Sequence, residues 1–282
     1  MTEKLEAESP QETVTGMDDD IQESVQSALQ KWGSWIWNFI EYVGGVTLLG
    51  GQVLQAIFIY PLNLRYIVRQ IYDIGAKSLS LTNLIAIFTG MVVALQFIVG
   101  LRRFGLELYS GQVVGVAITR ELGPVLTALM IASRVGSGIA AEIGSMQVSE
   151  QILAIRAMGG SPVAKLVLPR VLVTTLATPL LTVIAIFVGI FGGMLITILE
   201  AGVTVRFYMD QIQNTVEVYD FMSGVGKTVF FGFFIGCIAC YQGLKTTGGT
   251  KGVGDSTTKT VVYCSIVIFV ADFFLTKLFL LF

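Results

Sequence analysis

The stretch that decides the fold covers residues 120–159, RELGPVLTALMIASRVGSGIAAEIGSMQVSEQILAIRAMG. It opens with two charged residues, Arg120 and Glu121, at the edge of an apolar segment long enough to cross a membrane. Small residues then recur at every fourth position, namely Ala128, Ala132, Gly136, Ala140 and Gly144. In a bilayer, small residues at this spacing let another helix approach closely. The stretch predicts a transmembrane helix with a seam for helix packing and a charged end.

The composition of the whole chain extends this prediction to a helical bundle in lipid. Of the 282 residues, 54% are hydrophobic and only 13% are charged, which is typical of an integral membrane protein. Apolar segments near the length of the hydrocarbon layer predict five transmembrane helices, over residues 81–101, 121–143, 171–199, 228–244 and 261–282. The fold class we expect is therefore an all-α integral membrane protein.

The amino-terminal part divides into two further segments. Residues 1–30 hold eight acidic residues and one lysine, which predicts a disordered tail in the cytoplasm. Residues 31–64 begin with three tryptophans and aromatic residues at helical spacing, which favours an amphipathic helix that lies at the interface or re-enters the membrane. Residues 42–60 are uncharged, so a sixth transmembrane helix is the alternative. The bundle itself then occupies residues 65–282.

Basic residues predict the orientation, because they are enriched on the cytoplasmic side. Nine basic residues flank the span ends that would lie in the cytoplasm. Four basic residues flank the ends that would lie outside, namely Arg102, Arg103, Arg206 and Lys227. We therefore expect a cytoplasmic amino terminus and an external carboxyl terminus.

Several enzymatic functions are disfavoured by residues that are missing. The chain has no histidine, which excludes Ser-His hydrolases, histidine-ligated metals and imidazole relays. Its three cysteines lie in apolar stretches, so we expect no disulfide and no metal site. Residues 223–228, SGVGKT, end like a phosphate-binding loop, but Phe221 stands where the first glycine is needed. We expect no catalytic residues, no nucleic-acid binding and no nucleotide site on this chain.

Four charged residues form the first candidate site. Arg120 and Glu121 lie at the outer end of the second span, Lys227 lies at the outer start of the fourth, and Asp272 lies about midway through the fifth. Charges are costly inside a membrane unless they are paired or face water. Two interpretations stay open: ion pairs that lock the helices together, or the polar wall of a cavity for a charged amphiphile.

A second candidate site follows the second span. Residues 142–159 are predicted to leave the membrane as an amphipathic helix on the cytoplasmic side, between spans two and three, where a partner protein would dock. Its candidate contact residues are Glu142, Met146, Glu150, Ile152, Ile155 and Arg156. Residues 245–259, rich in glycine and threonine, are expected to form a flexible connection on the same side. Pairs of glycines at 189/193 and 232/236 indicate close helix packing, either within the chain or between two copies.

The sequence resembles the MlaE (YrbE) family of ABC-transporter permeases. The matching segments are 120–124 (RELGP), 134–137 (RVGS) and 141–144 (AEIG), followed by shorter matches at 150–151, 169–170, 257–262 and 272–273. The match runs from about residue 65 to the carboxyl end, and residues 1–30 are expected to match nothing in the family.

The resemblance implies a homodimeric permease of a phospholipid transport system in a bacterial inner membrane, with a periplasmic carboxyl terminus. It implies a cytoplasmic ABC ATPase dimer that holds ATP and Mg²⁺, so no cofactor is expected on this chain. It also implies an external hexamer of MCE-domain subunits and, in some members, a STAS-domain protein. A membrane scaffold for the ATPase and the MCE ring, without a lipid pathway of its own, is the alternative.

Overall fold

The computed structural model describes residues 37, 40–59, 64–279 and 281. Within these residues six helices are long and apolar enough to cross a membrane: Ile40–Ile59, Gln70–Arg102, Glu107–Val148, Val163–Ala201, Val218–Leu244 and Gly249–Phe279. The prediction of an all-α, multi-pass membrane protein is thereby confirmed. The predicted tail over residues 1–30 lies outside the described residues. The helix Ile40–Ile59 has the length of a span, and the interfacial and spanning alternatives for residues 31–64 both stay predictions.

Contacts divide the chain into two compact units, Met1–Leu48 and Leu49–Phe282. The second unit holds α2 (Leu64–Arg102), η1 (Glu107–Tyr109), α3 (Ser110–Ala117), η2 (Ile118–Leu122), α4 (Gly123–Ile131), η3 (Ala132–Gly136), α5 (Ser137–Val148), α6 (Gln151–Ala157), η4 (Val163–Val167), α7 (Leu168–Ala201), α8 (Val205–Thr215), α9 (Val218–Leu244) and α10 (Gly249–Phe279). The segments η2, η3 and η4 are single π-helical turns. Because α3 to α5 follow one another without a break, we call Ser110–Val148 the span-two helix.

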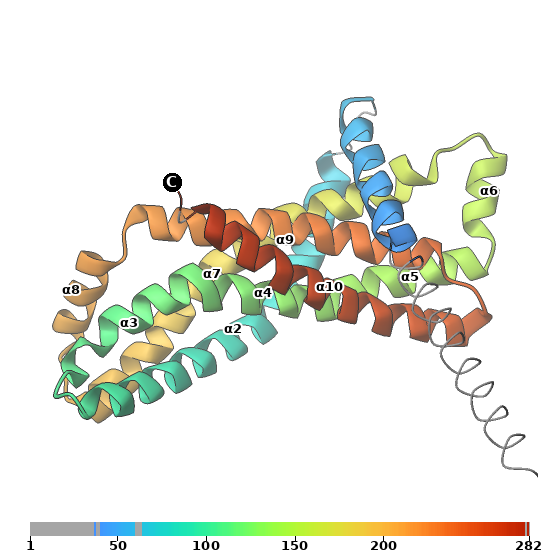
Figure 1. Cartoon of the computed structure of the whole chain (residues 1–282). Helices are drawn as coiled ribbons and strands as arrows, with labels where there is room; N and C mark the ends of the chain where they lie inside the picture. Colours follow the sequence, from blue (N-terminus) through green and yellow to red (C-terminus); the bar gives the residue numbers. More distant parts are fainter. Residues whose placement is uncertain (1–36, 38–39, 60–63, 280, 282) are drawn as a thin grey trace, which may run out of the picture. The chain divides into compact units, whose positions relative to one another are not determined.

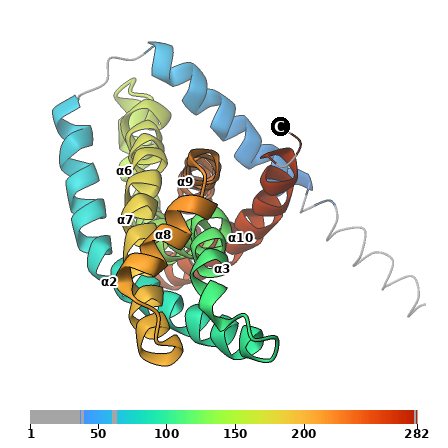
Figure 2. The same cartoon turned by 90° about the vertical axis from the view of Figure 1, so that its left-hand side faces the viewer.

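The long helices of this unit lie side by side. Helix α2 contacts α7, α7 contacts α9, and α9 contacts α10, while the span-two helix contacts α7, α9 and α10. The short helices α6 and α8 lie at opposite ends of the bundle (Figure 1), which we call the α6 end and the α8 end. Figure 2 looks along the bundle from the α8 end.

The five small residues at every fourth position of the span-two helix, which we call the ladder, face the interior of the protein. All five of its members are buried. A Cβ atom on Gly136 would lie 3.3 Å from Ile235 of α9 and 3.6 Å from Thr260 of α10, and one on Gly144 would lie 2.8 Å from Thr246. The ladder therefore packs against the last two long helices, which confirms the intrachain interpretation.

The two glycine pairs have the same role. A Cβ atom on Gly193 would lie 2.8 Å from Val114, and one on Gly189 would lie 3.2 Å from Ile118. A Cβ atom on Gly232 would lie 2.5 Å from the carbonyl oxygen of Thr174. Since lipid supplies little drive for helices to associate, such close approaches supply the contact area that holds them together.

Buried threonines give α7 its polar side chains without exposing them to lipid. The hydroxyl groups of Thr174, Thr178 and Thr182 each donate to the backbone carbonyl four residues earlier, at 2.6–3.1 Å. Each polar group is thereby satisfied within its own helix, as a membrane requires. Helix α7 runs without interruption through Pro179.

Helix α8 closes its end of the bundle by burying a tyrosine. Tyr208 has no exposed surface and its hydroxyl donates to the Ile190 carbonyl oxygen of α7 at 3.3 Å. Burial raises the pKa of the Tyr208 phenol, because the charged form would lose its hydration. The Gln211 amide donates to the Leu108 carbonyl oxygen at 2.6 Å and ties α8 to the start of the span-two helix.

The expected flexible connection at residues 245–259 is wrong, because α10 already begins at Gly249. Its threonines make the early start possible: Thr257 donates to the Gly254 carbonyl oxygen at 2.6 Å, and Thr260 donates to that of Ser256 at 2.7 Å. The hydroxyl of Ser256 also bonds to Thr246 at 2.9 Å. Hydrogen bonds to neighbouring carbonyls thus satisfy side chains whose composition alone indicates a loop.

The expected single helix over residues 142–159 is also wrong. Helix α5 ends at Val148, and Glu150 adopts a left-handed conformation with φ of 58° before α6 begins. A left-handed residue stops a helix because it turns the backbone out of the helical path. The chain therefore changes direction at Glu150, and α6 is a separate short helix (Figure 1).

A candidate lipid site at the α8 end

Lys227 is the centre of a cluster of charged residues within the bundle. Its side chain is 3% exposed. The ammonium nitrogen lies 2.8 Å from the Glu121 carboxylate, 3.0 Å from that of Asp272 and 2.9 Å from the Thr276 hydroxyl oxygen. An ammonium group has three donors, and here all three are used. Lys227 is thus held by the span-two helix and by α10.

Arg120 belongs to the same region but has a different partner. Its guanidinium donates to a carboxylate oxygen of Asp220 at 2.8 Å, and a second nitrogen lies 2.5 Å from the same oxygen. Asp220 is 2% exposed, and its other oxygen accepts from the Glu217 backbone N–H at 3.1 Å. Glu217 and Asp220 form a capping box that starts α9. The arginine therefore anchors the span-two helix to the first turn of α9.

These side chains border a cavity of about 270 Å³ at the α8 end. Its polar wall includes Arg120, Glu121, Asp220 and Lys227. Apolar side chains complete it, among them Tyr219 and Phe279. The side chain of Arg120 is 43% exposed, whereas that of Lys227 is buried. Arg120 is therefore the cation that a molecule in the cavity would meet.

Arg120 and Glu121 occupy a π-helical turn, η2. An extra residue in such a turn changes the direction in which neighbouring side chains point, and π turns are frequent at functional sites. The consequence here is that two adjacent residues reach different partners, Asp220 for Arg120 and Lys227 for Glu121.

The residues predicted at the α6 end are not all brought together. Glu142 lies on α5 and pairs with the buried Arg170 of α7 at 2.6 Å, and Met146 lies on the same helix. Ile152 of α6 is 2% exposed, and Ile155 is half-buried. Glu150 and Arg156 are exposed. Two apolar residues that the sequence analysis does not single out are also exposed here, Leu153 on α6 at 60% and Met158, which follows α6, at 76%.

The structure therefore unites three of the four predicted cavity residues, Glu121, Lys227 and Asp272, and places Arg120 beside them with Asp220. Asp220 and Thr276 were missed. The sequence predicts that the fourth span begins at residue 228, whereas α9 begins at Val218, so Asp220 lies within the helix and not in the connection before it. The signal that would have found it is the pair Glu217 and Asp220, three residues apart as in a capping box.

Two motifs have only structural roles. Residues 223–228 lie inside α9, and Lys227 is committed to the charged cluster. All three cysteines, Cys237, Cys240 and Cys264, are buried and free. Among the residues that the structure describes, no group of three His, Cys, Asp or Glu side chains is arranged to hold a metal.

Comparison with known proteins places these features in a family. The family model for the permease MlaE matches residues 67–278. A probable ABC transporter permease protein of Rickettsia conorii is 39% identical over 241 residues, covering 86% of this chain and 93% of that protein. The Haemophilus influenzae intermembrane phospholipid transport system permease protein MlaE is 37% identical over 213 residues, or 75% and 82% of the two chains.

A plant protein is similar over a longer region. The chloroplastic protein TRIGALACTOSYLDIACYLGLYCEROL 1 of Arabidopsis thaliana is 36% identical over 271 residues, covering 95% of this chain and 76% of that protein. A match of that extent includes part of residues 1–30, so the expectation that this segment matches nothing in the family is wrong. Together these similarities show that the chain belongs to the MlaE permease family and is a permease subunit of an ABC transporter.

Proposed function

We propose that the chain is the membrane subunit of an ATP-driven transporter that moves phospholipid between the inner and outer membranes of a bacterial envelope. The observation that carries this proposal is the cavity at the α8 end, which combines a half-exposed arginine with apolar walls. A phospholipid requires both features, because its phosphate pairs with a cation and its acyl chains pack against apolar side chains. The printed name of the Haemophilus influenzae relative, a phospholipid transport permease, supports the same substrate class.

Coupling to ATP hydrolysis is assigned to the α6 end. An exposed α6 with apolar side chains at Leu153 and Met158, beside exposed Glu150 and Arg156, suits docking into a groove on a cytoplasmic ABC ATPase dimer. The ion pair of Glu142 with Arg170 joins α5 to α7 next to this surface, so movement of α6 would reach two long helices. ATP and Mg²⁺ are bound by the ATPase in this proposal, and the permease itself carries no cofactor and catalyses no reaction.

The proposed assembly contains two copies of the chain in the bacterial inner membrane. The cavity at the α8 end opens beside α10, whose Phe273 and Phe274 are more than 60% exposed, and a second copy would cover these side chains. An MCE-domain hexamer would receive lipid at the α8 end, and a STAS-domain protein would bind the ATPase. The α6 end is assigned to the cytoplasm with the amino terminus, and the carboxyl terminus to the periplasm.

A decisive experiment changes Arg120, because it is the accessible cation of the cavity. The transporter is reconstituted with its ATPase and MCE partner, and ATP-dependent transfer of a fluorescent phospholipid between vesicles is measured. We expect Arg120→Gln to lower transfer about tenfold, since a charge-assisted hydrogen bond to phosphate is lost. Arg206→Gln, which removes an exposed cation from α8, is the matched control and keeps full transfer.

The alternative of a passive scaffold is favoured by one observation, namely that Lys227 is saturated by contacts within the chain. The double variant Arg120→Gln/Asp220→Asn distinguishes the two functions, because it also removes the buried carboxylate that Arg120 pairs with. If transfer returns to normal in the double variant, Arg120 is only a counterion for Asp220 and the scaffold gains support. If transfer stays low while the complex assembles, Arg120 acts on the lipid.

A further inference from the structure

A groove lies on the surface of α2 where this helix reaches the α8 end (Figure 1). It encloses about 510 Å³ and is lined by three apolar residues, two polar residues and one glycine: Leu95, Val99, Phe104, Gln96, Arg103 and Gly100. All six are exposed, so a molecule from the surrounding membrane can reach each of them. The groove shares no residue with the cavity around Arg120. We call it the α2 groove.

Arg103 gives the α2 groove a positive charge. The span Gln70–Arg102 ends beside it, and among the described residues Arg103 forms neither an ion pair nor a hydrogen bond. The neighbouring Arg102, by contrast, donates to the Glu200 carbonyl oxygen at 3.0 Å. No carboxylate is among the described residues that line the groove, and Glu107, which follows in the chain, makes no ion pair with Arg103. The groove therefore attracts an anion.

An apolar stripe leads from the α2 groove along the helix. Four side chains are 42–58% exposed at a spacing of three or four residues, namely Phe88, Val92, Leu95 and Val99. This spacing places them on one face of α2. The fifteen residues from Phe88 to Arg103 extend over about 22 Å, and half of a bilayer with its headgroups measures about the same. The face thus has the length and the polarity of one phospholipid.

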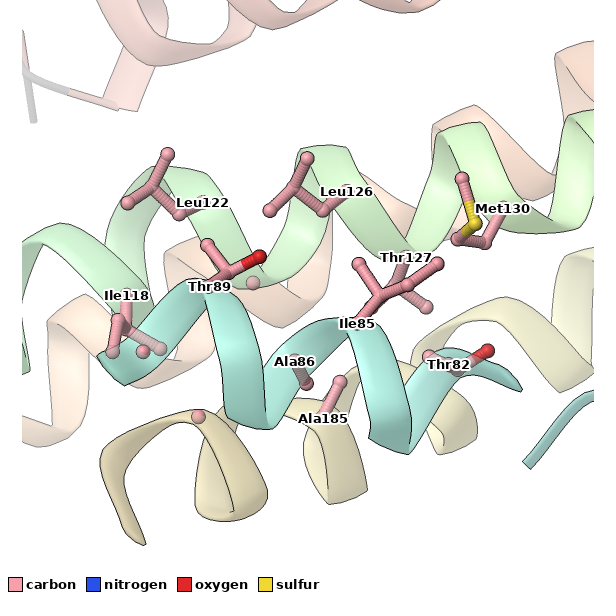
Figure 3. A pocket seen from close by; sticks show the side chains of 13 residues that line it. Thr82, Ile85, Ala86, Thr89, Ile118, Leu122, Leu126, Thr127, Met130 and Ala185 are labelled. Carbon is pink, nitrogen blue, oxygen red and sulfur yellow. The ribbon is translucent and has the colours of Figure 1, made fainter. Parts of the chain in front are cut away.

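The apolar crevice beside this face cannot hold an acyl chain. It lies between α2 and the span-two helix, where Ile85 and Thr89 of α2 and Leu126 of the span-two helix line it (Figure 3). It encloses only about 20 Å³. On another side α2 packs against α7, where a Cβ atom on Gly90 would overlap the Gly189 carbonyl oxygen. A lipid on this part of α2 is therefore restricted to the face with the groove.

Gln96 places an amide among the apolar residues of this face. Its side chain is exposed and makes no hydrogen bond within the part of the chain that the structure describes. An amide in hydrocarbon is costly unless it finds a partner. Gln96 lies about two turns further from the end of α2 than Arg103. In a membrane-bound phospholipid, the ester carbonyl oxygens likewise lie deeper than the phosphate, so they are suitable acceptors for this amide.

We propose that the α2 groove binds one anionic phospholipid from the leaflet at the α8 end. The phosphate pairs with Arg103, and the glycerol lies over Gly100, where no side chain fills the groove. The Gln96 amide donates to an ester carbonyl oxygen, and one acyl chain follows the apolar stripe. Arg102 adds a second positive charge nearby, which favours a headgroup with a net negative charge. The site requires only that the chain lies in a membrane, so it does not depend on lipid binding beside Arg120.

Gly100 allows the α2 groove to be filled without damage to the fold. A Cβ atom there would meet nothing within 4 Å, and leucine is a better helix former than glycine. Gly100→Leu therefore occupies the groove. Gly75→Leu, at another open position of α2, is the matched control. Arg103→Gln removes the charge, and Arg206→Gln, an exposed cation on α8, is the control for that change.

The experiment uses the full chain in phosphatidylcholine nanodiscs with a small amount of phosphatidylglycerol that carries a photoreactive group in its acyl chain. Labelled peptides are identified by mass spectrometry. Residues 180–187 of α7 measure contact with bulk lipid, because they include three exposed apolar side chains, Leu180, Ile184 and Phe187, and α7 has no cation after Arg170. We expect residues 88–99 to be labelled about tenfold more strongly than residues 180–187.

The variants test whether this labelling comes from the α2 groove. Gly100→Leu and Arg103→Gln are expected to lower the labelling of residues 88–99 to that of residues 180–187, and both controls keep it strong. Equal labelling of the two segments in the unchanged chain would overturn the proposal, and so would strong labelling in Arg103→Gln. Loss of the signal in the complete complex would show that a partner's helix covers α2, which would also reject the lipid site.

Competition identifies what the groove recognises. Unlabelled phosphatidylglycerol is expected to compete, whereas diacylglycerol with the same chains and inorganic phosphate are not. Competition by inorganic phosphate would assign the groove to free phosphate, and competition by diacylglycerol would leave Arg103 without a role; either result rejects the proposal. A photoreactive phosphatidylcholine is expected to label residues 88–99 less than the phosphatidylglycerol does, and equal labelling would reject the preference for an anionic headgroup.

Gln96→Leu gives an independent readout. Added phosphatidylglycerol is expected to raise the unfolding temperature of the full chain in detergent, and to raise that of Gln96→Leu less, because the hydrogen bond to the ester is lost. An equal rise in both would show that the Gln96 amide does not contact the lipid.

Discussion

Lys227 shows how one residue unites helices that lie far apart in the sequence. Its ammonium contacts Glu121, Asp272 and Thr276 at 2.8–3.0 Å, and the side chain is nearly fully buried. Taking a lysine out of water costs several kcal/mol, and only a complete set of partners offsets this cost. The sequence singles out Glu121, Lys227 and Asp272 as charges in apolar surroundings, but their pairing depends on the register of three helices, which a single sequence does not supply.

Removing the charge of Lys227 alone is therefore expected to destabilise the fold. Lys227→Met leaves two carboxylates without a partner and is expected to cost about 3–5 kcal/mol. The triple variant with Glu121→Gln and Asp272→Asn should recover most of this loss. The three buried cysteines report unfolding, so the temperature at which a thiol-reactive dye labels them measures stability. Lys259→Met is the exposed control, and a loss of similar size there would contradict the explanation.

At the scale of elements, the sequence predicted the existence of five long helices and missed their ends. Apolar length finds the part of a helix that lies in hydrocarbon, but α9 begins ten residues before the predicted residue 228 and α10 begins twelve before residue 261. These extra turns contain charged and hydroxyl side chains that lower their hydropathy, and they are stabilised by a capping box in α9 and by hydroxyl groups bonded to the backbone in α10. The break at Glu150 depends on one left-handed residue, and no glycine stands at this position to indicate it.

Two glycines of α9 provide a test of how closely the helices approach. Gly232→Ala would place a Cβ atom 2.5 Å from the Thr174 carbonyl oxygen, so α7 and α9 would have to separate. We expect a loss of about 1–3 kcal/mol. Gly226→Ala meets only Phe279, at 3.8 Å, and is expected to gain about 0.5–1 kcal/mol because alanine favours a helix. Thermal unfolding followed by dye labelling measures both, and equal effects would rule out the close approach as the cause.

At the scale of the whole molecule, the proposed function gives the two ends of the bundle different roles. The α8 end holds the charged cavity, and the α6 end holds the short helix with its exposed apolar side chains. The span-two helix joins them, since it carries Arg120 at one end and Arg134 and Glu142 toward the other. The excess of basic residues predicts which end lies in the cytoplasm, and this orientation stays a prediction.

The orientation of the bundle is expected to follow from labelling with a membrane-impermeant maleimide. Met158 lies at the α6 end and is 76% exposed, and Val218 lies at the start of α9 and is 80% exposed. Each is replaced by cysteine in a separate variant. In cells with a permeable outer membrane, we expect Val218→Cys to react at once and Met158→Cys only after the inner membrane is opened. The native cysteines are at most 1% exposed and stay unlabelled. The reverse order would invert the proposed topology.

The charged residues around Lys227 affect which lipid headgroup the cavity at the α8 end would favour. Among the residues that the structure describes, Asp220 pairs with Arg120, and Glu121 and Asp272 pair with Lys227, so three carboxylates share two cations. A zwitterionic lipid such as phosphatidylethanolamine adds no net charge to that surplus, and its amine would find an acidic neighbour while its phosphate meets the guanidinium. A purely anionic lipid would double the surplus. Under the proposed function, the chamber at this end therefore favours headgroups that bring their own positive charge.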